Sequence, residues 1–130
     1  MCSTIDWTQT QPVWATTPTV IAAWAFGSAQ AGVLRPGGDV DIGILVETPL
    51  TLAAQLDLLM RLQTALHVED IDLVILNSAN PILRFESISG RLLFCRDAQR
   101  RAEFASLTAR EYEDEMALWQ RSLRYRQSAG

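Results

Sequence analysis

Residues 19–46 read TVIAAWAFGSAQAGVLRPGGDVDIGILV, and this stretch decides the fold of the chain. Its opening apolar run stops at Gly27-Ser28, which is the pattern of a short buried strand followed by a turn. Its last eight residues alternate in period two, so the apolar side chains point to one face of a second strand. The polar face of that second strand begins with two carboxylates, Asp39 and Asp41.

The flanking segments predict the other elements. Residues 1–18 contain Pro12 and Pro18 and predict an irregular or briefly helical lead-in, with Trp7 and Trp14 as packing points. The small residues of 28–34 favour one or two helical turns. Farther along, we expect a helix over 49–67, a strand over 70–77, a short helix over 80–89, an edge strand over 91–95 and a long helix over 97–126.

Two of the expected helices carry an apolar stripe. In the first helix the stripe predicts the face that lies on the sheet, and it consists of Leu52, Leu56, Leu59, Leu62 and Leu66. In the last helix the stripe is expected to pack mainly on its own domain, and it consists of Tyr112, Met116, Trp119 and Leu123. Its aromatic residues leave an interface with a partner protein as the alternative.

The order of strands and helices predicts one α/β (α+β) domain over residues 1–130. It should have a small mixed twisted sheet against one layer of helices. The 48% apolar content is enough for a buried core in a chain of 130 residues. No apolar run approaches the roughly 20 residues of a membrane helix and no signal-peptide pattern opens the chain, so we expect a cytoplasmic protein without a membrane partner.

The charged residues narrow the range of partners. All eleven basic residues are Arg, and the formal net charge is -4. Because no segment forms a basic stripe, we expect no direct nucleic-acid partner. The two cysteines, Cys2 and Cys95, and the single His67 lack companions at the spacing of a metal site or a disulfide framework. The chemistry of this chain therefore rests on its carboxylates.

Three features together predict a site for a nucleoside triphosphate. Asp39 and Asp41 share a face of one strand, and Asp72 joins them if its own strand lies alongside. Clustered carboxylate oxygens favour Mg²⁺, with Mn²⁺ as an alternative, and this spacing suits two ions. On the other side, Gly27 lets a ligand approach the backbone, while Ser28 and the amides of a following helix start offer donors to phosphate.

The neighbouring charged residues receive lesser roles. Arg35 is a secondary candidate for binding the phosphates. Glu69 and Asp70 are interpreted as a solvated turn at the start of the strand that carries Asp72. Arg84 is interpreted as a structural residue that pairs with Glu86 or Asp97.

The same residues resemble a known family. The pair Gly27-Ser28, ten intervening residues and then Asp39-Val40-Asp41 is similar to the signature of the minimal nucleotidyltransferases of the DNA polymerase beta-like superfamily. Residues 72–77 and 81–86 are similar to that family's third-carboxylate strand and its next helix. The resemblance covers about residues 19–97 and is greatest to the MntA-type antitoxins, which are paired with HEPN-domain toxins called HepT.

The resemblance implies a polymerase beta-like fold and a function. Such a protein is an antitoxin that transfers AMP from ATP to a tyrosine hydroxyl of its HEPN toxin, with which it forms a hetero-oligomer. In that interpretation Asp39, Asp41 and Asp72 are catalytic and hold two Mg²⁺ ions, while Gly27, Ser28 and Arg35 bind the nucleotide. Two alternatives stay open: transfer to a small molecule such as an antibiotic, and an antitoxin without catalysis that neutralises by binding alone.

Overall fold

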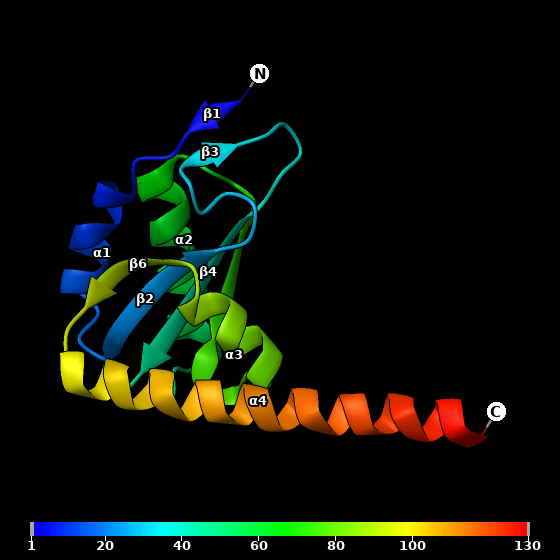
Figure 1. The fold of residues 1–130 in the computed structure, drawn as a ribbon. Helices are drawn as coiled ribbons and strands as arrows, with labels where there is room; N and C mark the ends of the chain where they lie inside the picture. Colours follow the sequence, from blue (N-terminus) through cyan, green and yellow to red (C-terminus); the bar gives the residue numbers. More distant parts are fainter. Residues whose placement is uncertain (1, 130) are drawn as a thin grey trace.

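A mixed four-stranded sheet forms the centre of the computed structural model, which describes residues 2–129 (Figure 1). In spatial order the strands are β5 (Ile71–Ile75), β4 (Val40–Val46), β2 (Val20–Phe26) and β6 (Arg91–Cys95). The edge strand β5 runs parallel to β4, whereas β2 is antiparallel to both of its neighbours. This arrangement confirms the small mixed α/β sheet predicted from the sequence, with β6 at its edge.

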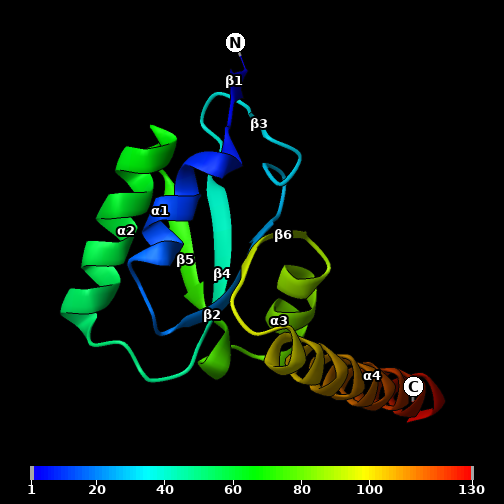
Figure 2. The ribbon, with the colours of Figure 1, turned by 90° about the vertical axis from the view of Figure 1, so that its left-hand side faces the viewer.

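Helices cover both faces of the sheet, so the expected single helical layer was wrong. Figure 2 shows two groups of helices on opposite sides of the strands. One side holds the 3-10 helix η1 (Trp7–Thr10), α1 (Gln11–Ala15) and α2 (Leu52–Leu66), and the other holds α3 (Pro81–Ile88) and α4 (Ala98–Ala129). The physical reason lies in β2, all seven residues of which are buried, because a strand that is apolar on both faces needs cover on both.

The two faces of β4 have different roles. Its predicted apolar face joins the core beneath α1 and α2, and it consists of Val40, Ile42, Ile44 and Val46. Its other face, which begins with Asp41, is turned toward α3, since a Cβ at Gly43 would overlap Oγ of Ser87. The alternation read from the sequence therefore separates the core from the polar face as expected.

The buried face of α2 differs from the predicted stripe in its first two turns. Leu58, Leu62 and Leu66 are buried, whereas Leu52 and Leu56 are 72% and 51% exposed. Leu62 and Leu66 belong both to the predicted stripe and to the face that is buried. Helical periodicity alone therefore does not show which side of the first two turns faces the core. The contact of α2 with the sheet and with α1 determines which side is buried.

The lead-in and the segment after β2 pair with each other. A two-residue strand, β1 (Ser3–Thr4), runs antiparallel to β3 (Val33–Leu34). Residues 28–31 form a turn rather than the expected helix, which was wrong because the chain reverses at Gly32 (φ 93°) and enters β3. Trp7 and Trp14 are buried, as predicted.

The long helix α4 packs through its first half only. Phe104 lies against Trp24, with ring centroids 6.3 Å apart, and Tyr112 stacks on Phe85 at 4.0 Å. Farther along, the helix projects away from the rest of the molecule (Figure 1), and Trp119 is 58% exposed. The expectation that its apolar stripe packs on its own domain is therefore correct for Tyr112 and wrong for Trp119. No helix within residues 2–129 combines the length and apolar character that a bilayer span requires.

Arg84 joins α3 to α4 and to the end of β5. Its guanidinium lies 3.3 Å from a carboxylate oxygen of Glu111 and donates to the backbone carbonyls of Leu76 and Asn77. The structural role predicted for Arg84 is confirmed, but the predicted partners, Glu86 and Asp97, were wrong. The reason is that α4 crosses α3 at Glu111, a contact far along the chain that local spacing does not indicate.

Candidate functional site

The parallel register of β4 and β5 brings the predicted carboxylates together. Asp41 is paired directly with Asp72, and Val40 with Ile71, so the two aspartates lie side by side on neighbouring strands. Directly paired residues of adjacent strands point to the same face of a sheet. Asp39 immediately precedes β4 and is exposed beside them. The juxtaposition that the sequence left conditional on strand order is thus present in the fold.

The pKa of Asp41 is raised above its ordinary value of 3.8. Partial burial is the main cause, and the negative charges of Asp39, Asp72 and Glu86 add to it, in that order. Three other carboxylates therefore lie close enough to Asp41 to act on its charge at this end of the sheet. Glu86 was not assigned to the site from the sequence, because its approach depends on α3 folding back over the polar face of β4. The capping residue Asn80, which accepts from the amide of Leu83 at 2.9 Å, marks where α3 begins but not which of its faces turns inward.

Gly27 touches the carboxylate of Asp41. The antiparallel register pairs Phe26, the last residue of β2, with Asp41, so the next residue lies against this side chain. Gly27 has a φ of 74°, and a Cβ at this position would overlap Oδ2 of Asp41. Only glycine satisfies both the left-handed backbone and the close approach without strain.

Ser28 and Arg35 lie in the exposed loop between β2 and β4. Ser28 opens the turn, in which the amide of Gln30 donates to the carbonyl of Gly27 at 3.4 Å. Phosphate donors at this point would come from a turn and not from the helix that the sequence predicted. Arg35 is exposed before a second turn, and its guanidinium makes no hydrogen bond or ion pair with the residues that the structure describes. Their nucleotide-binding roles stay predictions.

The donor set fits a hard divalent cation. Within residues 2–129, no group of three or more Asp, Glu, His or Cys side chains is placed so that it could hold a metal ion without moving. However, Asp39, Asp41 and Asp72 supply only carboxylate oxygens, the ligands that Mg²⁺ prefers. The pKa of Asp41 is raised first by burial and then by neighbouring negative charges, and a cation bound at this place would offset both effects.

We expect Asp41→Asn to raise the thermal unfolding midpoint at neutral pH in metal-free buffer. Because the folded-state pKa exceeds 3.8, the native carboxyl binds its proton more tightly than the unfolded one. The tighter binding of the proton stabilises the folded state at pH values below the pKa of Asp41 in the unfolded chain. This stabilisation is lost as the pH rises through the pKa of Asp41 in the folded protein. The uncharged amide of the Asn variant does not suffer that loss of stability. The increase in its thermal unfolding midpoint over the unsubstituted protein should therefore become smaller as the pH falls toward 3.8.

Thermal denaturation followed by circular dichroism across this pH range checks the expectation. Asp70→Asn is the matched control, because Asp70 is an exposed aspartate just before β5 that does not contribute to the raised pKa of Asp41. A lower midpoint for Asp41→Asn than for the unsubstituted protein at neutral pH would contradict it.

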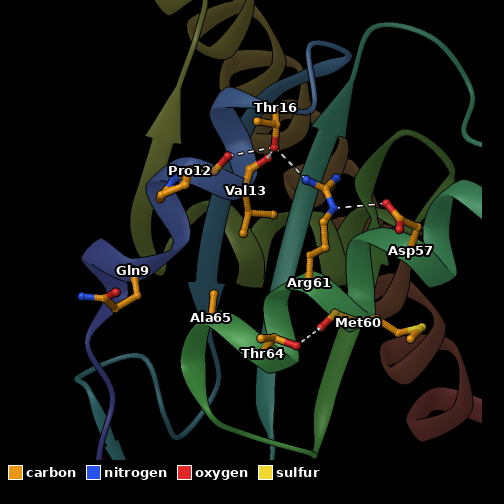
Figure 3. Close-up of a pocket in the computed structure, with 9 residues that line it drawn as sticks. All are labelled: Gln9, Pro12, Val13, Thr16, Asp57, Met60, Arg61, Thr64 and Ala65. Atoms are coloured by element: carbon orange, nitrogen blue, oxygen red, sulfur yellow. Dashed lines mark hydrogen bonds and ion pairs between the residues drawn. The ribbon is translucent and has the colours of Figure 1, made fainter.

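A separate cavity of about 540 Å³ lies on the opposite side of the sheet, between α1 and α2 (Figure 3). Its one guanidinium, that of Arg61, donates to Asp57 at 3.1 Å and to Thr16 and Thr17 at 2.7 Å each. These contacts join α2 to the end of α1, and they give the guanidinium of Arg61 its partners within the protein. None of the clustered carboxylates lines this cavity, so it is not the site predicted from the sequence.

Comparisons with known proteins identify the family and the fold. The family model described as polymerase beta, nucleotidyltransferase, matches residues 8–99. Three solved structures of toxin–antitoxin pairs are similar to the chain over most of its length. A toxin–antitoxin with AMP-PNP is 25% identical, with a TM-score of 0.76 and coverage of 94% of this chain and 98% of that one.

The other two structures have the same fold. An MntA–HepT pair with one tyrosine replaced by alanine is 26% identical, with a TM-score of 0.75 and coverage of 94% of this chain and 98% of that one. A tri-AMPylated HEPN toxin of Shewanella oneidensis in complex with MNT antitoxin matches at 24% identity and a TM-score of 0.69, over 92% and 96% of the two chains. No curated protein sequence matches significantly. Because the family model spans well over half of the chain, the chain belongs to the polymerase beta family of nucleotidyltransferase enzymes.

Proposed function

We propose that this protein is an antitoxin that transfers AMP from ATP to a tyrosine hydroxyl of a HEPN-domain toxin. The observation that carries the proposal is the register that pairs Asp41 with Asp72 beside the Gly27 turn. It is supported by the similar complexes that contain AMP-PNP or an AMPylated HEPN toxin. The antitoxin and its toxin would form a hetero-oligomer, in which the toxin brings its own acceptor residue.

Each residue of the site has a defined task in this proposal. Asp39, Asp41 and Asp72 would hold two Mg²⁺ ions, or Mn²⁺ in their place, on the face of the sheet that α3 covers. When bound, the metal ions supply Lewis-acid polarisation of the phosphates and make the acceptor hydroxyl easier to deprotonate. Gly27 keeps space open beside Asp41, since any side chain there would occupy it.

The phosphates would be bound on the other side of this cluster. The hydroxyl of Ser28 and the amides of the turn after Gly27 donate to phosphate oxygens, as exposed backbone donors do in anion sites. Arg35 is exposed in the loop that leads to Asp39, and its guanidinium would pair with the triphosphate.

The reaction balances without a further co-reactant. The tyrosine oxygen forms a bond to the α-phosphorus of ATP, the bond from that phosphorus to its bridging oxygen breaks, and pyrophosphate leaves with the electron pair. The hydroxyl proton is released to solvent. The protein contributes by aligning the two reactants and offsetting the developing charge.

One assay tests this function against its alternatives. The protein is incubated with Mg²⁺, ATP and the product of the neighbouring reading frame, which the proposal takes to be the toxin, and intact masses are recorded before and after. The expected result is AMP on the toxin, located to a tyrosine by fragmentation. AMP found only on an added aminoglycoside would favour a small-molecule transferase, and a stable complex with unchanged masses would favour neutralisation by binding alone.

A further inference from the structure

A groove runs from the carboxylate cluster along the junction of α3 and α4. Two cavities form it, of about 410 Å³ and about 480 Å³. The first includes Gly27 in its lining and so adjoins Asp41, and both cavities share Ile82 and Glu86. The second continues to Glu115 on α4. Together they make a path that begins at the site of the proposed chemistry and extends over the outer surface of the helices.

Apolar and aromatic side chains form part of the groove's lining, together with the polar Gln30, Asn80 and Ser89. Phe85 and Tyr112 stack with their ring centroids 4.0 Å apart and their planes within 9°, which fastens α3 to α4 beside the first cavity. Pro81, Ile82 and Leu83 line the second cavity. A bound chain would therefore meet preformed apolar contacts with a few polar groups among them, as is usual for ligand-binding clefts.

The charges that line the groove are all negative. Glu86 lies where the two cavities meet and Glu115 lies in the second, while no Arg belongs to the described lining of either. The nearby guanidinium of Arg84 is already bound by Glu111 and by two backbone carbonyls. A triphosphate would be repelled along this path, whereas a positively charged polypeptide would be attracted.

We infer that this groove binds the acceptor, a polypeptide segment in which Arg or Lys side chains flank the hydroxyl-bearing residue. The apolar side chains of the lining hold the segment, Glu86 and Glu115 bind the flanking cations, and the hydroxyl is thereby placed at the Gly27 end of the groove, next to Asp41. This inference rests on the proposed function for the identity of the reaction, but the binding preference is a property of the groove alone.

Binding of defined peptides tests the preference without any turnover. Short fluorescent peptides with a central tyrosine flanked by Arg, Gln or Glu are titrated with the full chain in the absence of ATP, and anisotropy is recorded. The Arg-flanked peptide should bind about 10-fold or more tightly than the Glu-flanked one, since two attractive ion pairs, with Glu86 and Glu115, replace two repulsive contacts. Equal binding of the three peptides would overturn the inference.

Variants of Glu115 separate the groove from the catalytic cluster, because Glu115 is not among the groups that raise the pKa of Asp41. Glu115→Gln should weaken binding of the Arg-flanked peptide about 2- to 5-fold, the usual effect of one exposed ion pair, and Glu115→Arg about 10-fold or more. Glu113→Gln is the matched control, since Glu113 is exposed on the same helix and lines neither cavity. An equal effect of the Glu113 and Glu115 substitutions would overturn the inference.

Steady-state transfer to the toxin gives the second measurement. Glu115→Arg should raise KM for the toxin about 10-fold and leave kcat and KM for ATP unchanged, because it acts only on acceptor binding. A raised KM for ATP instead would assign the groove to the nucleotide and refute the inference. If the peptides show the predicted selectivity but no AMP is transferred to any acceptor, the proposed reaction fails while the binding preference stands.

Discussion

Replacing Asp39 and Asp41 together by Asn should lower the rate of AMP transfer by about three orders of magnitude or more. Carboxylate-held metal ions contribute several kcal/mol of transition-state stabilisation, and each 1.36 kcal/mol is a factor of ten in rate. The amide keeps the shape of the side chain but supplies no charge to a divalent cation. The rate is measured by intact mass of the toxin after timed incubation with ATP and Mg²⁺.

The double variant should remain folded. Asp39 is exposed, and the raised pKa of Asp41 shows that its charge is unfavourable in the folded state without a cation. The matched control is Glu69→Gln with Asp70→Asn, which removes two exposed carboxylates just before β5 and should leave transfer within about 2-fold of normal. Undiminished transfer by the Asp39 and Asp41 variant would show that the assigned metal ligands are wrong.

Gly27→Ala should reduce transfer about 100-fold and also lower the free energy of unfolding by about 1–3 kcal/mol. The new Cβ would overlap Oδ2 of Asp41, so the carboxylate must move, and displacements near 1 Å cost about that factor in rate. The loss of stability comes from the left-handed backbone at φ 74°, which an alanine adopts only with strain.

Gly37→Ala is the control that separates these two effects. Gly37 has nearly the same φ, 75°, but a Cβ there would meet no atom within 4 Å. The Gly37→Ala variant should therefore lose about 1 kcal/mol of stability and keep nearly the full rate of AMP transfer. Chemical denaturation and the mass-based transfer assay on both variants check the pair. An equal loss of activity in the two variants would mean that the contact between Gly27 and Asp41 has no part in catalysis.

The elements that were predicted well are those whose signals are local. The apolar run of β2, the period-two alternation of β4 and the cap at Asn80 each act within a few residues of the chain. Consequently the bounds of the four predicted strands differ from the structure by at most two residues, and Asp41 lies on the polar face as expected.

The misplaced features depend on contacts between distant segments. The pairing of β1 with β3 joins residues about thirty positions apart and replaces the short helix expected after Ser28. The burial of Leu58 in place of Leu52 and Leu56 follows from where α2 meets the sheet and α1. Likewise, Arg84 is paired with Glu111 because α4 crosses α3, and no local pattern marks that crossing.

By itself the sequence determined which residue types could form the site, because the spacing of Gly27, Asp39 and Asp41 at the ends of two successive strands is a property of the chain. Only the tertiary structure decided which groups meet there. Parallel pairing of β4 with β5 brought Asp72 beside Asp41, and the packing of α3 over that face added Glu86 and created the groove. The physical reason is that backbone periodicity sets the direction of a side chain locally, whereas its neighbours are set by strand register and helix packing between segments far apart in the chain.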